Sequence, residues 1–454
     1  GPDAITLDVA PDWRVMLFSV AVSLLTGVIF GLAPAWRSSR VSVSGTLKEA
    51  GRGMTGSATK IGLGKALVIV QIAVSVVLLI GAGWFVRTLR NLQHVDLGYE
   101  REKLIVMRVD PLSAGYSGPR LAAVYREMEA RFRGIPGVRA VAWSENGLFS
   151  GSESGDQIEV EGFKPAKKGD DHSSFDVVGP NYFSSLGIPV LLGREIGPQD
   201  NETAPRTCVV NQAFAKFYFG KASPIGKHVK DLFPDTRVTM EIVGVVADVR
   251  DHGLRGDIRR RFYISALRPM GTEFSSFMNY ELRTVGDTAG VIQAARGIVR
   301  QINPAITIDS ARLLTEMVDR RLTQEKLIAQ LSGGFGALAL LLACIGLYGV
   351  LSYGVAQRTN EIGIRMALGA EQGRVIRMIL RETSLLMIIG LGTGIPAALA
   401  CARFVQSKLY GLKAADPLTL AVAAGILISV AILAGYLPAR RASKVDPLEA
   451  LRYE

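Results

Sequence analysis

Five long stretches without a charged side chain constrain this chain more than any other feature of its sequence. They are Val15–Trp36, Ala66–Val86, Leu327–Gln357, Thr383–Ala402 and Pro417–Ala439. Each has about 20 or more residues, and a helix rising about 1.5 Å per residue needs about 20 to cross the ~30 Å hydrocarbon core of a bilayer. Buried helices of a soluble core, the alternative, are seldom charge-free for so long. The sequence therefore predicts a multi-pass α-helical membrane protein with five spans.

The charges are divided unevenly between these stretches and the polar segment after the second one. Residues 91–325 hold 30 Lys and Arg against 30 Asp and Glu, whereas the chain holds 52 against 41. The whole excess of +11 therefore flanks the predicted spans. A nucleic-acid-binding domain would carry its own basic surface, so we do not expect the polar segment to bind nucleic acid.

The basic residues beside the spans predict how the chain crosses the membrane. They predominate in residues 37–65, in residues 358–381 and after Ala439. Cytoplasmic loops carry such an excess. We therefore expect these segments inside, the spans in contact with membrane lipid, and residues 91–325 outside as one large domain.

The outside domain is expected to be α+β. A strand, a helix over Arg120–Arg133 and a second strand follow one another, and a similar β-α-β set lies near residues 278–310. Two such sets make a split, ferredoxin-like porter unit, here residues 103–150 and 275–310. A strand-rich subdomain, residues 150–275, is inserted between them.

A charged helix is predicted to connect this domain with the third span. Residues Ala311–Leu331 contain no Gly or Pro that would interrupt it before the apolar stretch. Such a helix could carry motion into the membrane, or it could be a solvated linker.

The sequence shows no catalytic, cofactor or metal motif. It has no G-x-x-x-x-G-K-[S/T], H-E-x-x-H or G-x-S-x-G pattern. Cys208, Cys344 and Cys401 have neither disulfide nor metal spacing. The chain is therefore not expected to be an enzyme, and because no span carries a charge, it is not expected to be an ion-coupled transporter.

Small residues mark the fourth predicted span. Gly390, Gly392, Gly394 and Pro396 lie within its apolar stretch. Proline removes a backbone hydrogen bond, and glycines let helices approach closely. A kink or a packing groove that is used in motion is expected here, with plain helix packing as the alternative.

The most informative segment lies between the third and fourth stretches. An amphipathic helix with Ile362, Ile364, Met366 and Leu368 is predicted on the cytoplasmic side, with Arg358, Glu361 and Arg365 on its polar edge. It is either an interfacial helix held by lipid headgroups or a docking helix for a cytoplasmic partner.

The motif "QRTNEIGIRMALGA" within this segment resembles the coupling signature of the MacB/FtsX-type ABC transporter permeases. "VVGPNYFSSLGIPVLLGREIGPQD" is similar to the periplasmic core domain of that family, and "LPARRASKVDPLEALRYE" to its C-terminal end. The resemblance implies a non-catalytic permease, without cofactor, in the bacterial inner membrane, with its large domain in the periplasm. Its partners would be a separate cytoplasmic ABC ATPase and a periplasmic adaptor or effector.

Carried over position by position, the family's coupling contacts fall on eight residues. They would be Glu361, Gly363, Ile364, Arg365, Ala367, Leu368, Gly369 and Ala370. Gly363 and Gly369 would permit close approach of the partner's backbone, and Arg365 could pair with an acidic rim on the ATPase.

The first apolar stretch is surplus to the family's four-span unit. Residues 31–48 match residues 435–452 in Gly, Pro-Ala, Arg, Ser, Val and Leu at the same offsets. The chain is therefore expected to be the C-terminal part of a duplicated, two-unit permease. The predicted parts are the last span of a preceding unit (1–36), a cytoplasmic basic linker (37–65), the first span of the FtsX-like unit (66–90), the MacB-like core domain (91–325) and a three-span permease domain (326–454) with coupling helix 358–370.

Two functions remain open from the sequence. One is export of peptides, amphiphilic drugs or lipoproteins, driven by the ATPase. The other is a regulatory permease whose moving outside domain controls a cell-envelope enzyme or a stress response. The size of the outside domain favours export.

Overall fold

The structure, a computed structural model, describes residues 12–39, 63–232, 237–268, 277–359, 362, 364, 368, 371–413 and 415–443. The chain divides into two compact units, Gly1–Leu63 and Gly64–Glu454. In the first unit, the apolar stretch forms helix α1, Trp13–Ser39. Its fully described apolar part, Trp13–Leu25, is shorter than a span, so a fifth span stays a prediction.

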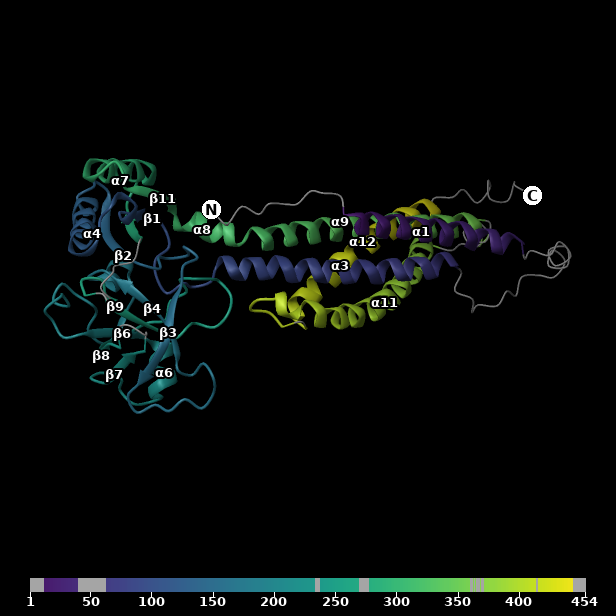
Figure 1. The fold of residues 1–454 in the computed structure, drawn as a ribbon. Helices are drawn as coiled ribbons and strands as arrows, with labels where there is room; N and C mark the ends of the chain where they lie inside the picture. The colour runs from purple at the N-terminus through teal and green to yellow at the C-terminus, as the bar shows by residue number, and fades with distance from the viewer. Residues whose placement is uncertain are drawn as a thin grey trace. The chain divides into compact units, whose positions relative to one another are not determined.

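Four helices of the second unit are long and apolar enough to cross a membrane (Figure 1). They are α3 (Leu63–Gln93), α9 (Thr323–Gln357), α11 (Gln372–Val405) and α12 (Pro417–Ala442). Their shared core contains Ile72, Leu347, Leu386 and Leu427, each buried. We call these four helices the helical core. They coincide with the last four predicted stretches.

Glycines of α11 bring this helix close to α3. A Cβ atom on Gly390 would lie 2.4 Å from Ile72 Cγ2, and one on Gly394 would lie 2.9 Å from the Ala73 carbonyl oxygen. By contrast, a Cβ on Gly392 would meet nothing within 4 Å. Helix α11 continues through Pro396. Close packing is thus present at two of the three glycines, and a use of this span in motion stays a prediction.

The packing predicts different outcomes for two neighbouring substitutions. Gly394→Ala is expected to destabilise the helical core by about 1–3 kcal/mol, because the new methyl group meets backbone that cannot move cheaply. Gly392→Ala, the control, is expected to be neutral or slightly stabilising, because alanine favours a helix. Thermal unfolding of both variants in detergent measures the difference. Equal melting temperatures would contradict the close approach.

The remaining elements of the second unit form a mixed domain, here called the sheet domain. Its strands are β1 (Leu104–Asp110), β2 (Val138–Ser144), β3 (Ser154–Val160), β4 (His172–Val178), β5 (Val190–Gly193), β6 (Thr207–Asn211), β7 (His228–Asp231), β8 (Thr239–Val246), β9 (Arg261–Ser265), β10 (Met278–Thr284) and β11 (Thr307–Leu313). Its helices are α4 (Gly118–Arg133), α5 (Tyr182–Leu186), α6 (Gln212–Phe219), α7 (Thr288–Ile302) and α8 (Leu314–Arg321).

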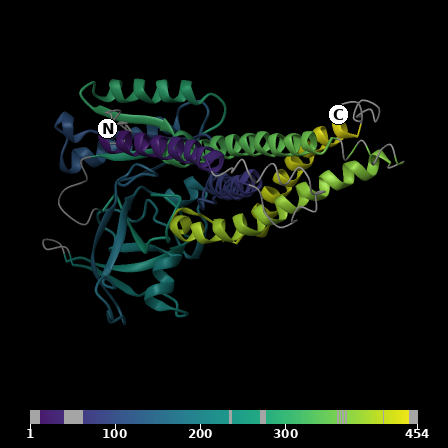
Figure 2. The same cartoon turned by 90° about the vertical axis from the view of Figure 1, so that its right-hand side faces the viewer.

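The two β-α-β sets meet in one part of the sheet, with strand order β11-β1-β10-β2. Successive side chains of a strand face opposite ways, and both faces of β1 are buried. Ile105 and Met107 join a core with α4 and α7, which lie side by side (Figures 1 and 2). Leu104 and Val106 join a second core with α5 and α8. Helices thus cover the sheet on both faces.

The inserted strands form a closed sheet of their own. They follow the order β4-β3-β7-β8-β6-β9, and β4 pairs with β9 as well as β3. Closure leaves the six strands without a free edge. A single residue pair, Ser144 with Val178, links β2 to this barrel.

The prediction of one continuous helix over Ala311–Leu331 is wrong. Strand β11 extends to Leu313, and Leu322 separates α8 from α9. The side chain of Leu322 is buried in the same core as Leu314 and Val318 of α8. Helix α8 therefore ends where the Leu322 side chain packs into the sheet domain, although no Gly or Pro is present there.

Candidate functional site

The structure describes only part of the predicted coupling segment. Six of the eight predicted contact residues lie outside the described residues: Glu361, Gly363, Arg365, Ala367, Gly369 and Ala370. Ile364 and Leu368 are described, and the Leu368 N–H donates to the Ile364 carbonyl at 3.0 Å, as in a helical turn.

The described apolar residues of this segment divide by burial. Ile362 is 2% exposed and packs in the helical core, whereas Ile364 is 48% and Leu368 83% exposed. One side chain therefore holds the segment against the helices. The other two leave an apolar surface open on the predicted cytoplasmic side.

Charged residues connect the ends of three helices beside this surface. Glu382 of α11 pairs with Lys65 of α3 and, at 3.5 Å, with Arg358 at the end of α9. Arg374 and Arg377, on the first turns of α11, are exposed. Exposed apolar residues and exposed arginines thus follow one another in this part of the chain, and protein–protein interfaces are enriched in Arg and have an apolar centre.

On the opposite side, polar contacts join the sheet domain to the helical core. The guanidinium of Arg255, in the loop after β8, donates to the Lys408 carbonyl at 2.9 Å and lies 3.4 Å from the carboxylate of Glu325 on α9. Arg87 of α3 pairs with Asp416, which caps α12. The ends of α3 and α12 are thus tied to each other, and the domain is tied to the start of α9 and to the segment after α11.

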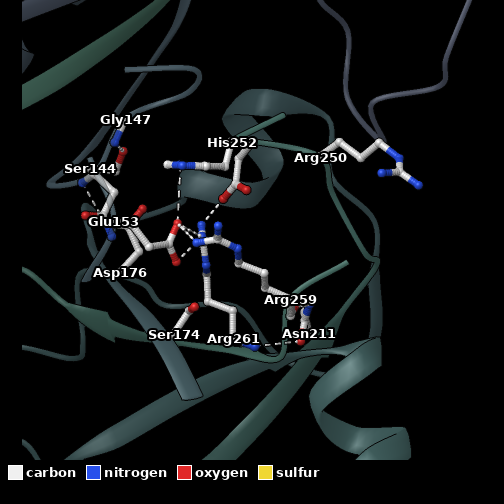
Figure 3. Close-up of polar contacts among 12 residues, drawn as sticks. Ser144, Gly147, Glu153, Ser174, Asp176, Asn211, Arg250, His252, Arg259 and Arg261 are labelled. Atoms are coloured by element: carbon white, nitrogen blue, oxygen red, sulfur yellow. Dashed lines mark hydrogen bonds and ion pairs between the residues drawn. The ribbon is translucent and has the colours of Figure 1, made fainter. Parts of the chain in front are cut away.

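A buried charged group, the Arg261 cluster, lies beside the paired strands β4 and β9 of the sheet domain (Figure 3). Arg261 of β9 is 3% exposed and pairs with Glu153, at 2.8 Å, and with Asp251. Arg259 also contacts Glu153, at 2.9 Å, but from the exposed side. Asp176 of β4 accepts a hydrogen bond from the Asn146 N–H at 3.0 Å.

Burial and charge set the pKa values in this cluster. Burial raises the pKa of Asp176 to about 7, although Arg261 opposes the shift. Burial also acts to raise the pKa of Glu153, but Arg261 and Arg259 outweigh it and hold the pKa below its ordinary value. Arg261 thus helps keep Glu153 ionised, whereas burial prevails at Asp176.

The loop after β8 connects the cluster to the junction with the spans. Asp251 pairs with Arg261 inside the domain, and Arg255, four residues later, contacts α9 and the end of α11. Sequence reasoning missed this connection, because nothing in the loop's composition distinguishes it from a solvated turn. Within the described ranges, no group of three or more His, Cys, Asp or Glu side chains could hold a metal ion.

Family comparisons cover most of the second unit. The model of the MacB-like periplasmic core domain matches residues 66–312, and that of the FtsX-like permease C-terminal region matches residues 333–447. These are the sheet domain with its preceding helix, and the three later helices.

Individual relatives are similar over the same region. The pyoverdine export ATP-binding/permease protein PvdT of Pseudomonas syringae pv. syringae is 27% identical over 63% of this chain and 43% of its own length. The macrolide export ATP-binding/permease protein MacB of Hahella chejuensis is 26% identical over 62% and 43%. The ABC transporter permease YknZ of Bacillus subtilis is 27% identical over 74% and 82%. The chain thus spans less than half the length of the PvdT and MacB relatives.

Proposed function

We propose, from the premise that this chain belongs to the MacB/FtsX-type ABC transporter permeases, that it couples a separate cytoplasmic ABC ATPase to movement of its outside domain. The observation that carries the proposal is the open apolar pair Ile364 and Leu368, on a turn whose neighbour Ile362 is anchored in the helical core. A surface fixed to the spans can pass a push from a docked partner to them.

The contacts on the other side support transmission to the sheet domain. Arg255 contacts α9 and also Lys408, which follows the C-terminal end of α11. Helices α9 and α11 are the two that flank the coupling segment. Movement of either helix relative to the other would therefore act on the loop that carries Arg255 and Asp251. The given sequence contains no G-x-x-x-x-G-K-[S/T] motif, and in this proposal the energy comes from an ABC ATPase partner.

Export is the favoured activity. Two relatives carry export of pyoverdine or of macrolides in their names, and we extend this to peptides, amphiphilic drugs or lipoproteins as cargo, with a periplasmic adaptor. The alternative is the regulatory permease, acting on a cell-envelope effector. A neighbouring gene for a periplasmic adaptor would favour export, and one for a cell-wall hydrolase would favour the regulatory function.

The finer architecture belongs to the same proposal. We infer a location in the inner membrane, with the sheet domain in the periplasm as a split ferredoxin-like porter unit and its insert. The strand order β11-β1-β10-β2 supports the porter unit. The likeness of residues 31–48 to residues 435–452 supports a duplicated two-unit permease.

Charge reversal in the coupling segment tests the proposed function. Arg365→Glu is expected to abolish co-purification with the cytoplasmic ATPase and to remove ATP-dependent transport, because like charges at an interface repel strongly. Membrane levels are expected to stay near normal. The matched control is Arg126→Glu, at an exposed position of α4. If the mutant still co-purifies with the ATPase and still transports, the coupling segment is only an interfacial anchor.

A further inference from the structure

A cavity of about 200 Å³ lies at the junction between the sheet domain and the helical core. Its lining includes Phe85 of α3, Glu325 and Ile328 of α9, Arg255 of the domain loop, and Lys408 after α11. Apolar and charged residues from four separate segments therefore line one space.

The cavity lies at the depth of lipid headgroups. Phe85 is the second-last residue of one charge-free stretch, and Ile328 is the second residue of the next. Lys408 follows the end of a third stretch by six residues. The apolar lining therefore adjoins the hydrocarbon region, and the charged lining lies just beyond it.

The charges in the cavity are incompletely satisfied. Arg255 and Glu325 are 3.4 Å apart, which is long for an ion pair. Among the described residues, Glu325 Oε2 and Arg255 Nε are buried and have no hydrogen-bond partner. The Glu325 carboxylate and the Arg255 guanidinium both line the cavity, so it offers an acceptor to a cation beside a donor to an anion.

We propose that this cavity binds the headgroup of an aminophospholipid such as phosphatidylethanolamine. Its phosphate contacts Arg255 and Lys408, and its primary ammonium donates to Glu325. The acyl chains pass Phe85 and Ile328 toward the lipid-exposed side of α9, where Leu331 is 61% exposed. A choline headgroup has no N–H to donate, and a glycerol headgroup has no cation.

Native mass spectrometry of the full chain in mild detergent tests the site. The protein is mixed with equal amounts of phosphatidylethanolamine, phosphatidylcholine and phosphatidylglycerol that share the same acyl chains. We expect the ethanolamine lipid to be retained about tenfold more than either other lipid, because neither of them can donate a hydrogen bond from an ammonium group to Glu325. Equal retention of the three lipids would overturn the proposal.

Single substitutions test which side chains produce the preference for the ethanolamine lipid. Glu325→Gln is expected to remove the preference for the ethanolamine lipid, and Lys408→Gln to reduce retention of all phospholipids. Glu316→Gln, at an exposed carboxylate of α8, is the matched control and is expected to keep the preference. A preference that survives Glu325→Gln in a monodisperse, normally melting protein would refute the assignment.

A soluble competitor separates a lipid from an exported amphiphile of the same charge pattern. Free phosphoethanolamine in excess is expected not to displace the lipid, because it lacks the acyl chains that contact Phe85 and Ile328. Displacement would show that headgroup charge alone fills the cavity, and would overturn the lipid as its occupant. None of these measurements requires the ATPase, so a failure of the coupling proposal leaves their outcome unchanged.

Discussion

Replacing Arg261 with methionine is expected to lower the free energy of unfolding by about 3–5 kcal/mol, because the change removes the buried cation that pairs with Asp251 and Glu153 and lies near buried Asp176. Arg261 is 3% exposed and pairs with Glu153 and Asp251. Methionine keeps most of the side-chain volume, so the effect reports the charge rather than a cavity. Thermal or chemical unfolding of the full chain in detergent measures it.

The matched control is Arg259→Met. Arg259 contacts the same carboxylate, at 2.9 Å, but its side chain is 49% exposed. Exposed ion pairs contribute about 0–1 kcal/mol, so this variant is expected to unfold almost as the parent does. Equal losses in the two variants would show that burial of Arg261 has no special effect.

The deficit of the Arg261→Met variant is also expected to depend on pH. The pKa of Asp176 is already raised from 3.8 to about 7 in the folded protein. A raised carboxyl pKa means that the folded state holds a proton that the unfolded state has lost, so the stability from this group falls as pH rises from about 4 to 7. Without Arg261 the penalty for ionisation grows. The loss of unfolding free energy caused by Arg261→Met should therefore be larger at pH 8 than at pH 5.

Replacing Leu368 with aspartate is expected to weaken binding of the cytoplasmic ATPase by about 30-fold or more. Leu368 is 83% exposed, so the folded chain loses little packing, whereas an apolar anchor at an interface can contribute 2 kcal/mol or more. An aspartate there would also be desolvated on docking. Co-purification and titration of the solubilised permease with the ATPase measure the loss.

Leu191→Asp serves as the control for this substitution. Leu191 lies on β5 of the sheet domain and is 45% exposed, on the side expected to face away from the ATPase. The same chemical change there should leave ATPase binding unaltered. If Leu368→Asp binds as tightly as the control, the exposed apolar surface is not the docking site.

Much of the architecture could be predicted from the sequence because the relevant forces are local. A helix that satisfies its own backbone needs only a long apolar run to span a bilayer, and α3, α9, α11 and α12 coincide with four such runs. The two β-α-β sets were likewise predictable from the spacing of apolar side chains, since period 2 and period 3.6 patterns are read over a few residues.

The coupling segment was predicted from its motif, but its surface was not. Spacing alone places Ile362, Ile364 and Leu368 together as apolar residues of one short helix. Packing against the helical core decides that Ile362 is buried and the other two are exposed. In the same way, only the register of α11 against α3 distinguishes Gly390 and Gly394, which make close contacts, from Gly392.

Long-range contacts decided the rest. Glu153, Asp176, Asp251 and Arg261 come from four separate segments, and each alone is typical of a solvated strand or turn. The pairing of β4 with β9 brings Asp176 and Arg261 together, and folding of the preceding loops adds Glu153 and Asp251. Leu322 ends a helix only because the sheet domain binds its side chain. The sequence by itself determined which segments enter the membrane and which become strands or helices, because composition and periodicity act over a few turns. Tertiary structure alone decided where charges are buried and where the domain contacts the spans, because those energies depend on partners far apart in the chain.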